Sequence, residues 1–389
     1  MGGGAWLFFE KILLLGKGLI LAYLYANWLS REVYGEYQFI IAFLGVVSIL
    51  IFPGMGVAIV QALARGKDGI FSRAASLLFR SAFLGSGILF LSAGYYLYSE
   101  KPDLAKSLAL LALVFPGYIV MNIWRYYYTG KAQFDRLVRT SIVLETISLL
   151  STSAALLYFP QLIWLVMLGV ALPIPFSLLL VWRLHMKTRD MDSDSDNIRF
   201  GRSISYTVGL STLATYGDKL ILGHFLGFSD LAVYSVALII PEQAKGAIAS
   251  FMVPLLPQYS AAGKKGELKD HFIFFAVISF AGAVTLYFLM PIFFRMVFPQ
   301  YVDGILFARV LLVILLFIPF VLLETFFRSQ KKERVVFRAN FIGSVLGLVL
   351  AIGLVPAFGI IGAVFAKLLG QLVQGASFAL SLREDSAQK

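Results

Sequence analysis

Residues 304 to 327 read GILFARVLLVILLFIPFVLLETFF, and only Arg309 and Glu324 in this run carry a charge. A helix of about 20 apolar residues is long enough to cross the ~30 Å hydrocarbon core of a bilayer. Lipid offers backbone amides no hydrogen-bond partner, and the strands of a membrane barrel would read as alternating segments of about ten residues. The run therefore predicts a transmembrane α-helix.

Comparable apolar runs recur along the chain. Of its 389 residues, 59% are hydrophobic and 14% charged, whereas soluble domains are about half apolar and a quarter charged. This composition excludes a soluble globule and leaves no room for a sizeable soluble domain. We predict an all-α integral membrane fold of about 12 transmembrane helices, at residues 6–28, 38–63, 75–98, 107–128, 140–158, 162–182, 203–226, 231–256, 271–294, 304–327, 339–354 and 360–381.

The net charge of +11 is unevenly distributed over the predicted loops. Basic residues are retained on the cytoplasmic side of a membrane, so alternate loops can be compared. One set of loops holds most of the lysines and arginines, and the other holds only Arg31, Lys101, Lys106 and Arg295. We therefore expect a multi-pass protein of the cytoplasmic membrane with both termini in the cytoplasm. The basic residues indicate lipid and topology, and no nucleic acid partner is predicted.

A polar stretch interrupts the apolar pattern near the middle of the chain. We interpret residues 186–202 as a cytoplasmic linker between two six-helix bundles, residues 1–185 and 203–389. Since each bundle has an even number of spans, the two share one orientation, and their repeat is expected to be parallel, about a pseudo-two-fold axis along the membrane normal. A shift of 197 residues aligns Trp28, Leu29 and Tyr37 with Phe225, Leu226 and Tyr234.

Charged residues inside the predicted spans are the candidate functional groups. Each is costly near the bilayer centre, by ~2.5 to 3.5 kcal/mol on insertion scales, so it is expected to face water or a partner. Lys11, Arg80, Arg125 and Arg309 lie near span ends, where they can reach the membrane surface. The deeper residues are expected either to line a cavity or to form structural ion pairs, with Lys219 and Glu242 as one possible pair. They are Lys17, Glu145, Asp218, Lys219, Glu242, Lys245 and Lys367.

Catalytic chemistry has no recognisable motif in the chain. There is no cysteine, and His185, His224 and His271 show neither metal-ligand spacing nor a nucleophile to act on. We predict no catalytic residue, no metal site and no cofactor. The predicted outer loops are about ten residues or shorter, too short to hold the site of an extracytoplasmic glycan enzyme, so the chain is predicted not to be an enzyme.

Both halves of the chain contain short motifs that can be compared with those of known families. The first half contains YGEY at 34–37, GMG at 54–56 and ARG at 64–66. The second contains DKLILG at 218–223, FLG at 225–227, VYSVA at 233–237 and VPLLP at 253–257. These motifs, together with the twelve-span layout, resemble those of the polysaccharide-biosynthesis exporters of O-antigen and teichoic acid. These exporters are the oligosaccharide flippases of the multidrug/oligosaccharidyl-lipid/polysaccharide (MOP) exporter superfamily.

The resemblance implies a fold like that of the multidrug exporters, two six-helix bundles around a central cavity. It also implies flipping of a polyprenyl-diphosphate-linked oligosaccharide for surface polysaccharide synthesis, by alternating access driven by a proton or sodium ion. Lys17, Lys219, Lys245 and Lys367 are the candidates for binding substrate anions, because the spans hold more bases than acids. Asp218, Glu145 and Glu242 are the candidates for ion coupling. The alternatives are a cation-coupled multidrug exporter of the same fold and a membrane-embedded polyprenyl-phosphate glycan enzyme.

Overall fold

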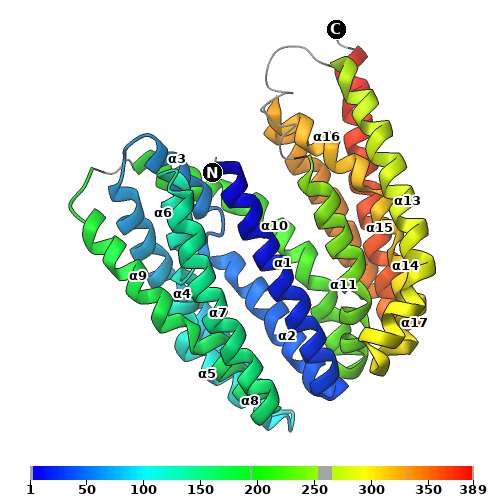
Figure 1. The fold of residues 1–389 in the computed structure, drawn as a ribbon, viewed down its shortest axis with the longest axis horizontal. Coiled ribbons are helices and arrows are strands. Elements are labelled where there is room, and N and C mark those ends of the chain that lie inside the picture. Colours follow the sequence, from blue (N-terminus) through cyan, green and yellow to red (C-terminus); the bar gives the residue numbers. More distant parts are fainter. Residues whose placement is uncertain (1–2, 193–194, 253–264, 331, 388–389) are drawn as a thin grey trace. The chain divides into compact units, whose positions relative to one another are not determined.

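The computed structural model describes residues 3–192, 195–252, 265–330 and 332–387. Helices are the only regular elements in these ranges, and they form two compact units, residues 1–213 and 214–389 (Figure 1). The units divide between Leu213 and Ala214, inside helix α10, which runs from Ser195 to Phe225. The predicted linker, residues 186–202, therefore lies in the first unit. The motif at 253–257 lies outside the described residues.

The first unit is built from helices that follow one another with short connections. They are α1 (Gly3–Trp28), α2 (Arg31–Ser48), η1 (Ile49–Ile51), α3 (Met55–Ala64), α4 (Gly69–Tyr98), α5 (Pro102–Val120), α6 (Ile123–Gly130), α7 (Phe134–Tyr158), α8 (Leu162–Trp164), η2 (Leu165–Ala171) and α9 (Pro173–Thr188). Several predicted spans are broken helices, such as α2, η1 and α3 in the second span. That break is at Phe52, whose φ of 49° is left-handed and cannot continue a right-handed helix.

The second unit takes the last part of α10 and the helices that follow. They are α11 (Phe228–Ser250), α13 (Lys265–Val297), η3 (Pro299–Gly304), α14 (Ile305–Leu311), α15 (Val313–Leu316), α16 (Ile318–Ser329) and α17 (Glu333–Ala387). The two last predicted spans both fall in α17, where Gly359 has a non-helical backbone that separates two helices.

The two helices of α17 pack closely through glycines. A Cβ added to Gly343 would lie 2.7 Å from the carbonyl oxygen of Gly370, and one added to Gly370 would lie 3.1 Å from the Cα of Gly347. Small residues at such positions let two helix backbones approach within a membrane. The reversal at Gly359 therefore makes a tight helical hairpin, and the hairpin positions Lys367.

The backbone of Gly359 makes this reversal sensitive to substitution. Its φ of 62° and ψ of −141° belong to a region that only glycine adopts at low cost. We expect Gly359→Ala to lower the free energy of unfolding by roughly 1 to 3 kcal/mol. Gly353→Ala is the matched control, since its added methyl group meets open space in the same helix segment. Thermal unfolding in detergent should separate the two variants; equal melting temperatures would contradict the assignment.

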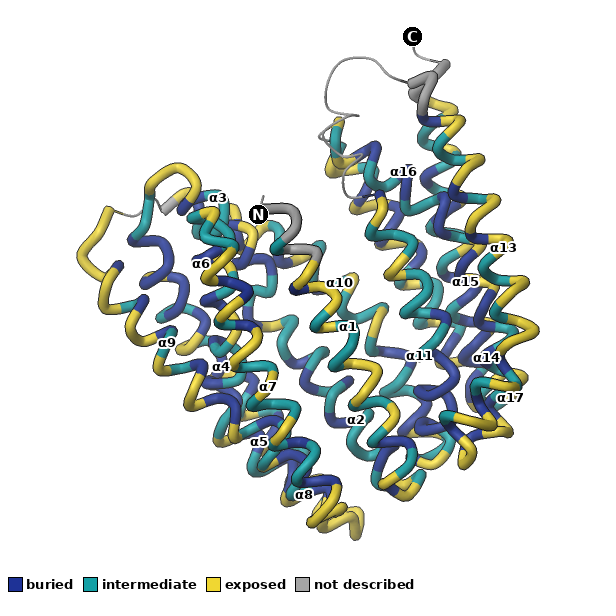
Figure 2. Tube along the Cα trace, in the orientation of Figure 1, coloured by how far each residue is buried: buried dark blue, intermediate teal, exposed yellow. Residues whose placement is uncertain are grey.

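Many large hydrophobic side chains are exposed in both units, and Figure 2 marks the exposed positions in yellow. On α4, for example, Phe83, Leu84, Phe90 and Leu91 are all exposed, as lipid-facing residues are. Within the described residues, nine helical segments are long and apolar enough to cross a membrane. Helices α1 and α10 are not among these nine, and both carry charged residues of the candidate site. The all-helical, multi-pass membrane fold predicted from the sequence is confirmed.

Candidate functional site

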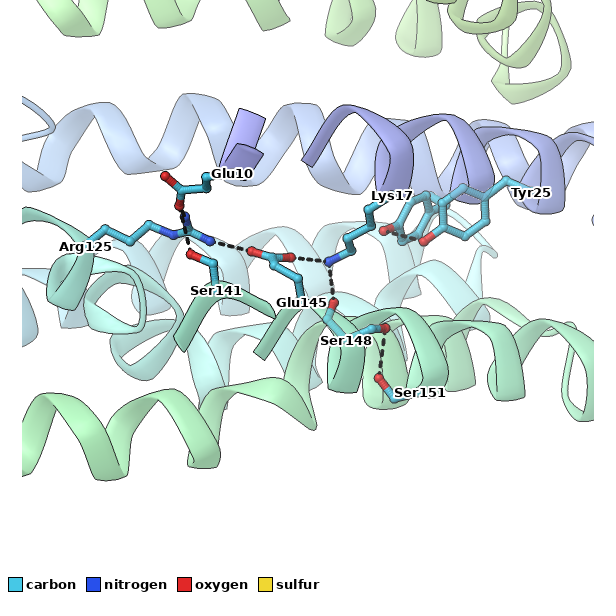
Figure 3. Close-up of polar contacts among 9 residues, drawn as sticks. Glu10, Lys17, Tyr25, Arg125, Ser141, Glu145, Ser148 and Ser151 are labelled. Atoms are coloured by element: carbon cyan, nitrogen blue, oxygen red, sulfur yellow. Dashed lines mark hydrogen bonds and ion pairs between the residues drawn. The ribbon is translucent and has the colours of Figure 1, made fainter. Parts of the chain in front are cut away.

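A chain of ion pairs joins α1, α6 and α7 in the first unit (Figure 3). The Lys17 ammonium lies 2.6 Å from Oε2 of Glu145, and Arg125 Nη2 lies 2.6 Å from Oε1 of the same carboxylate. The other Nη of Arg125 contacts Glu10. Glu145 is thus shared between two cations, and Arg125 between two carboxylates.

Neutral hydroxyl groups complete this network. Ser141 donates to Glu10 at 2.8 Å, and Lys17 donates to Ser148 at 2.7 Å. The Arg125 guanidinium also lies over the Trp124 ring, 4.8 Å from its centroid. Two acids balance two bases here, so every charge in the network has an opposite charge beside it.

Helix periodicity explains why these residues meet. Glu10 and Lys17 are seven residues apart, which places them on one face of α1, two turns from each other. Ser141, Glu145 and Ser148 follow at intervals of four and three, so they form one stripe along α7. Packing the two faces together brings Lys17 opposite Glu145 and Glu10 opposite Ser141, and Arg125 of α6 contacts both carboxylates.

A second polar cluster lies in the second unit, on α10, α11 and α17. Tyr234 donates its hydroxyl hydrogen to Oδ2 of Asp218 at 2.6 Å, and the Lys367 ammonium lies 3.2 Å from the same oxygen. Lys367 also lies 3.6 Å from Glu242. Asp218 is almost fully buried, whereas the Glu242 side chain is 41% exposed.

Lys245 differs from the other lysines of this cluster. Its ammonium donates to the side-chain oxygen of Gln371 at 3.3 Å, and no carboxylate contacts it in the described part of the chain. Lys219 follows Asp218 in the sequence and also belongs to this cluster. The cluster therefore holds three lysines, at 219, 245 and 367, and two acids, Asp218 and Glu242. Gln371 lies one turn beyond Lys367 on α17, and Gln374 one turn further donates to Asn340. This cluster therefore keeps a positive excess and extends into neutral amide groups.

The structure brings together several of the residues predicted from the sequence, in two groups. Lys17 and Glu145 pair in the first unit, and Asp218, Glu242 and Lys367 form ion pairs in the second. The carboxylate of Glu242, predicted to pair with Lys219, contacts Lys367.

Other residues of the two networks are not predicted from the sequence. Arg125 was predicted to reach the membrane surface, and this is wrong, because it contacts two carboxylates within the unit. Glu10, Tyr234 and Gln371 were not predicted as site residues. The seven-residue spacing to Lys17 is the signal that could have identified Glu10.

The two clusters lie at positions that do not correspond in the two halves of the sequence. A shift of 197 residues relates α1 to α10 but sets Lys17 opposite Ala214 and Asp218 opposite Leu21. The internal repeat therefore does not relate the clusters.

Among the residues that the structure describes, no group of three or more His, Asp or Glu side chains could hold a metal ion.

Comparison of the sequence with family models yields one match. Residues 3–262 match the model described as polysaccharide biosynthesis protein. No curated protein sequence matches the chain significantly.

Solved structures resemble the chain over nearly its whole length. An inward-facing multidrug resistance MATE transporter of the MOP superfamily has a TM-score of 0.74 and 16% identity, covering 95% of both chains. The lipid II flippase MurJ, in an inward closed conformation, has a TM-score of 0.72 and 15% identity, covering 98% of this chain and 87% of its own. A Pyrococcus furiosus transporter of the superfamily has a TM-score of 0.61 and 13% identity, covering 100% and 97%. At these identities the likeness establishes a shared fold.

Proposed function

Because the chain belongs to the polysaccharide biosynthesis protein family, we propose that it flips a polyprenyl-diphosphate-linked oligosaccharide across the cytoplasmic membrane. The product would serve the assembly of a cell-surface polysaccharide. The lipid II flippase MurJ has the same fold, so this architecture is compatible with lipid flipping. In this proposal the chain makes and breaks no covalent bond.

The observation that carries the proposal is the positive excess of the second cluster. Lys245 is bound to a neutral amide, so its charge is available to an anionic group of the substrate. Charge-assisted hydrogen bonds to phosphate oxygens are among the strong polar contacts, and an amide such as Gln371 suits a sugar hydroxyl. We assign the diphosphate to Lys245, with Lys219 and Lys367 contributing charge. Lys17 contributes less, because Glu145 and Ser148 already occupy its ammonium.

Ion coupling is assigned to the second cluster as well. Asp218 accepts from Tyr234 and Lys367, and Glu145 is held by Lys17 and Arg125. Glu242 has one ion-pair contact in the described chain, at 3.6 Å, and is the most exposed of the three acids. We propose that Glu242 takes up the coupling proton or sodium ion during alternating access.

Leaflet exposure of a labelled polyprenyl-diphosphate oligosaccharide in proteoliposomes tests the proposed function. A proton or sodium gradient should accelerate the appearance of the label in the opposite leaflet. Empty liposomes and liposomes with a heat-inactivated protein give the background rate. Failure with several glycans, together with gradient-driven efflux of a cationic dye, would overturn the proposal in favour of a multidrug exporter.

A further inference from the structure

Pro291 interrupts the backbone hydrogen bonding of α13. Proline has no N–H group, so the carbonyl four residues earlier, that of Tyr287, loses its helical partner. Arg309 on α14 replaces that partner by donating Nε to the Tyr287 carbonyl oxygen at 3.1 Å. Its guanidinium also lies 4.5 Å from the centroid of the Tyr287 ring. The backbone carbonyl and the ring together fix the orientation of the guanidinium.

This guanidinium lies on an apolar, membrane-facing surface. Tyr287 is 45% exposed, and Phe288, which follows it on α13, and Leu306 on α14 are more exposed still. Arg309 forms no ion pair with any residue that the structure describes, and its two Nη groups remain for another partner. An arginine in lipid without an anion is costly, and local thinning of the bilayer is one way in which phosphate groups come to reach it. Tyr287 lies ten residues from Val297 at the end of α13, a distance of ~15 Å along the helix.

We propose that Arg309, held by Tyr287, binds the phosphate of an anionic phospholipid at the membrane-facing surface of the second unit. The two Nη groups form a planar fork that matches two phosphate oxygens. The exposed apolar side chains of α13 and α14 offer contact area for the acyl chains. This site is separate from both ion-pair clusters and does not depend on the proposed transport function.

Lipid titration followed by native mass spectrometry of the purified protein tests this site. The probes are phosphatidylglycerol, phosphatidylcholine and polyprenyl diphosphate. Arg309→Gln is expected to weaken phosphatidylglycerol binding about fivefold, the effect of one basic residue at an anionic lipid surface, and to leave phosphatidylcholine binding unchanged. Tyr287→Leu should weaken binding as well, because the guanidinium loses its ring. Tyr287→Phe is the matched control and should bind like the wild type, since it keeps both ring and carbonyl.

A second pair of variants separates lipid binding from helix repair. Pro291→Ala restores the N–H group that satisfies the Tyr287 carbonyl, so Arg309→Gln in that background leaves no carbonyl without a partner. The double variant should still bind phosphatidylglycerol more weakly than Pro291→Ala alone. Equal binding in these two, or equal affinity of the wild type for phosphatidylglycerol and phosphatidylcholine, would overturn the site. If the protein bound polyprenyl diphosphate at this site but did not bind phosphatidylglycerol, the proposal that Arg309 binds a phospholipid would be overturned.

Discussion

Lys245→Gln is expected to lower the rate of oligosaccharide flipping by at least about tenfold. The substitution removes the ammonium that we assign to the diphosphate, and a hydrogen bond to a charged group contributes about 1.5 to 3 kcal/mol. A loss of 1.4 kcal/mol corresponds to a factor of ten. The fold should persist, because a glutamine at this position can still bond to Gln371. Initial rates of leaflet exposure in proteoliposomes, at equal protein content, measure the effect.

Lys106→Gln is the matched control for this prediction. Lys106 lies on α5, its side chain is 66% exposed, and it pairs with Asp103 at 3.6 Å. Its removal should leave the flipping rate at the wild-type value. Lys245→Glu should reduce flipping further than the glutamine variant, because a carboxylate repels the diphosphate. If Lys245→Gln and Lys106→Gln flipped at the same rate, Lys245 would not contact the substrate.

Glu145→Gln should destabilise the first unit strongly. Both Lys17 and Arg125 lose a carboxylate at once, and each is only about one-fifth exposed. Breaking a buried ion pair by removing one partner costs roughly 3 to 5 kcal/mol, because an uncompensated charge is left behind. The melting temperature in detergent should therefore fall well below that of the wild type. Flipping should decline in parallel as folded protein is lost.

Two variants show whether the network itself is responsible. Ser148→Ala removes a neutral partner of Lys17 and should cost about 1 kcal/mol. Lys17→Met with Glu145→Gln removes one base and one acid together, so the double variant should be less destabilised than the sum of its single changes. Strict additivity, or a melting temperature of Glu145→Gln equal to that of Ser148→Ala, would show that the ion pairs contribute little.

These two predictions assign different roles to the two clusters. In the cluster of the first unit, acids and bases are equal in number and bind one another, which suits a structural connection among α1, α6 and α7. In the cluster of the second unit, lysines outnumber acids, and Lys245 is bound only by an amide in the described chain. Substitution in the first cluster should therefore affect mainly stability, and substitution of Lys245 mainly transport.

The amino-acid sequence by itself determined the class of this protein. Apolar runs such as residues 304–327 have a single solution in lipid, because only a helix satisfies its own backbone hydrogen bonds within the segment. The same reasoning predicted two spans in 339–381, although it did not identify Gly359 as the point of reversal. Charges within the spans were equally visible, since a lysine or glutamate in an apolar run stands out whatever its partner.

Only the tertiary structure decided which of these charges meet. Lys17 and Glu145 are 128 residues apart in the sequence, and Lys367 and Asp218 are 149 apart. Helical periodicity places a charge on a face of its own helix, but the neighbour of that face depends on how the helices pack. Arg125 illustrates the limit, because it lies near a span end, where the sequence predicts contact with the membrane surface. Packing instead directs Arg125 toward two carboxylates. It also brings the Nε of Arg309 to the carbonyl that Pro291 leaves without a helical partner, a contact that no sequence pattern showed.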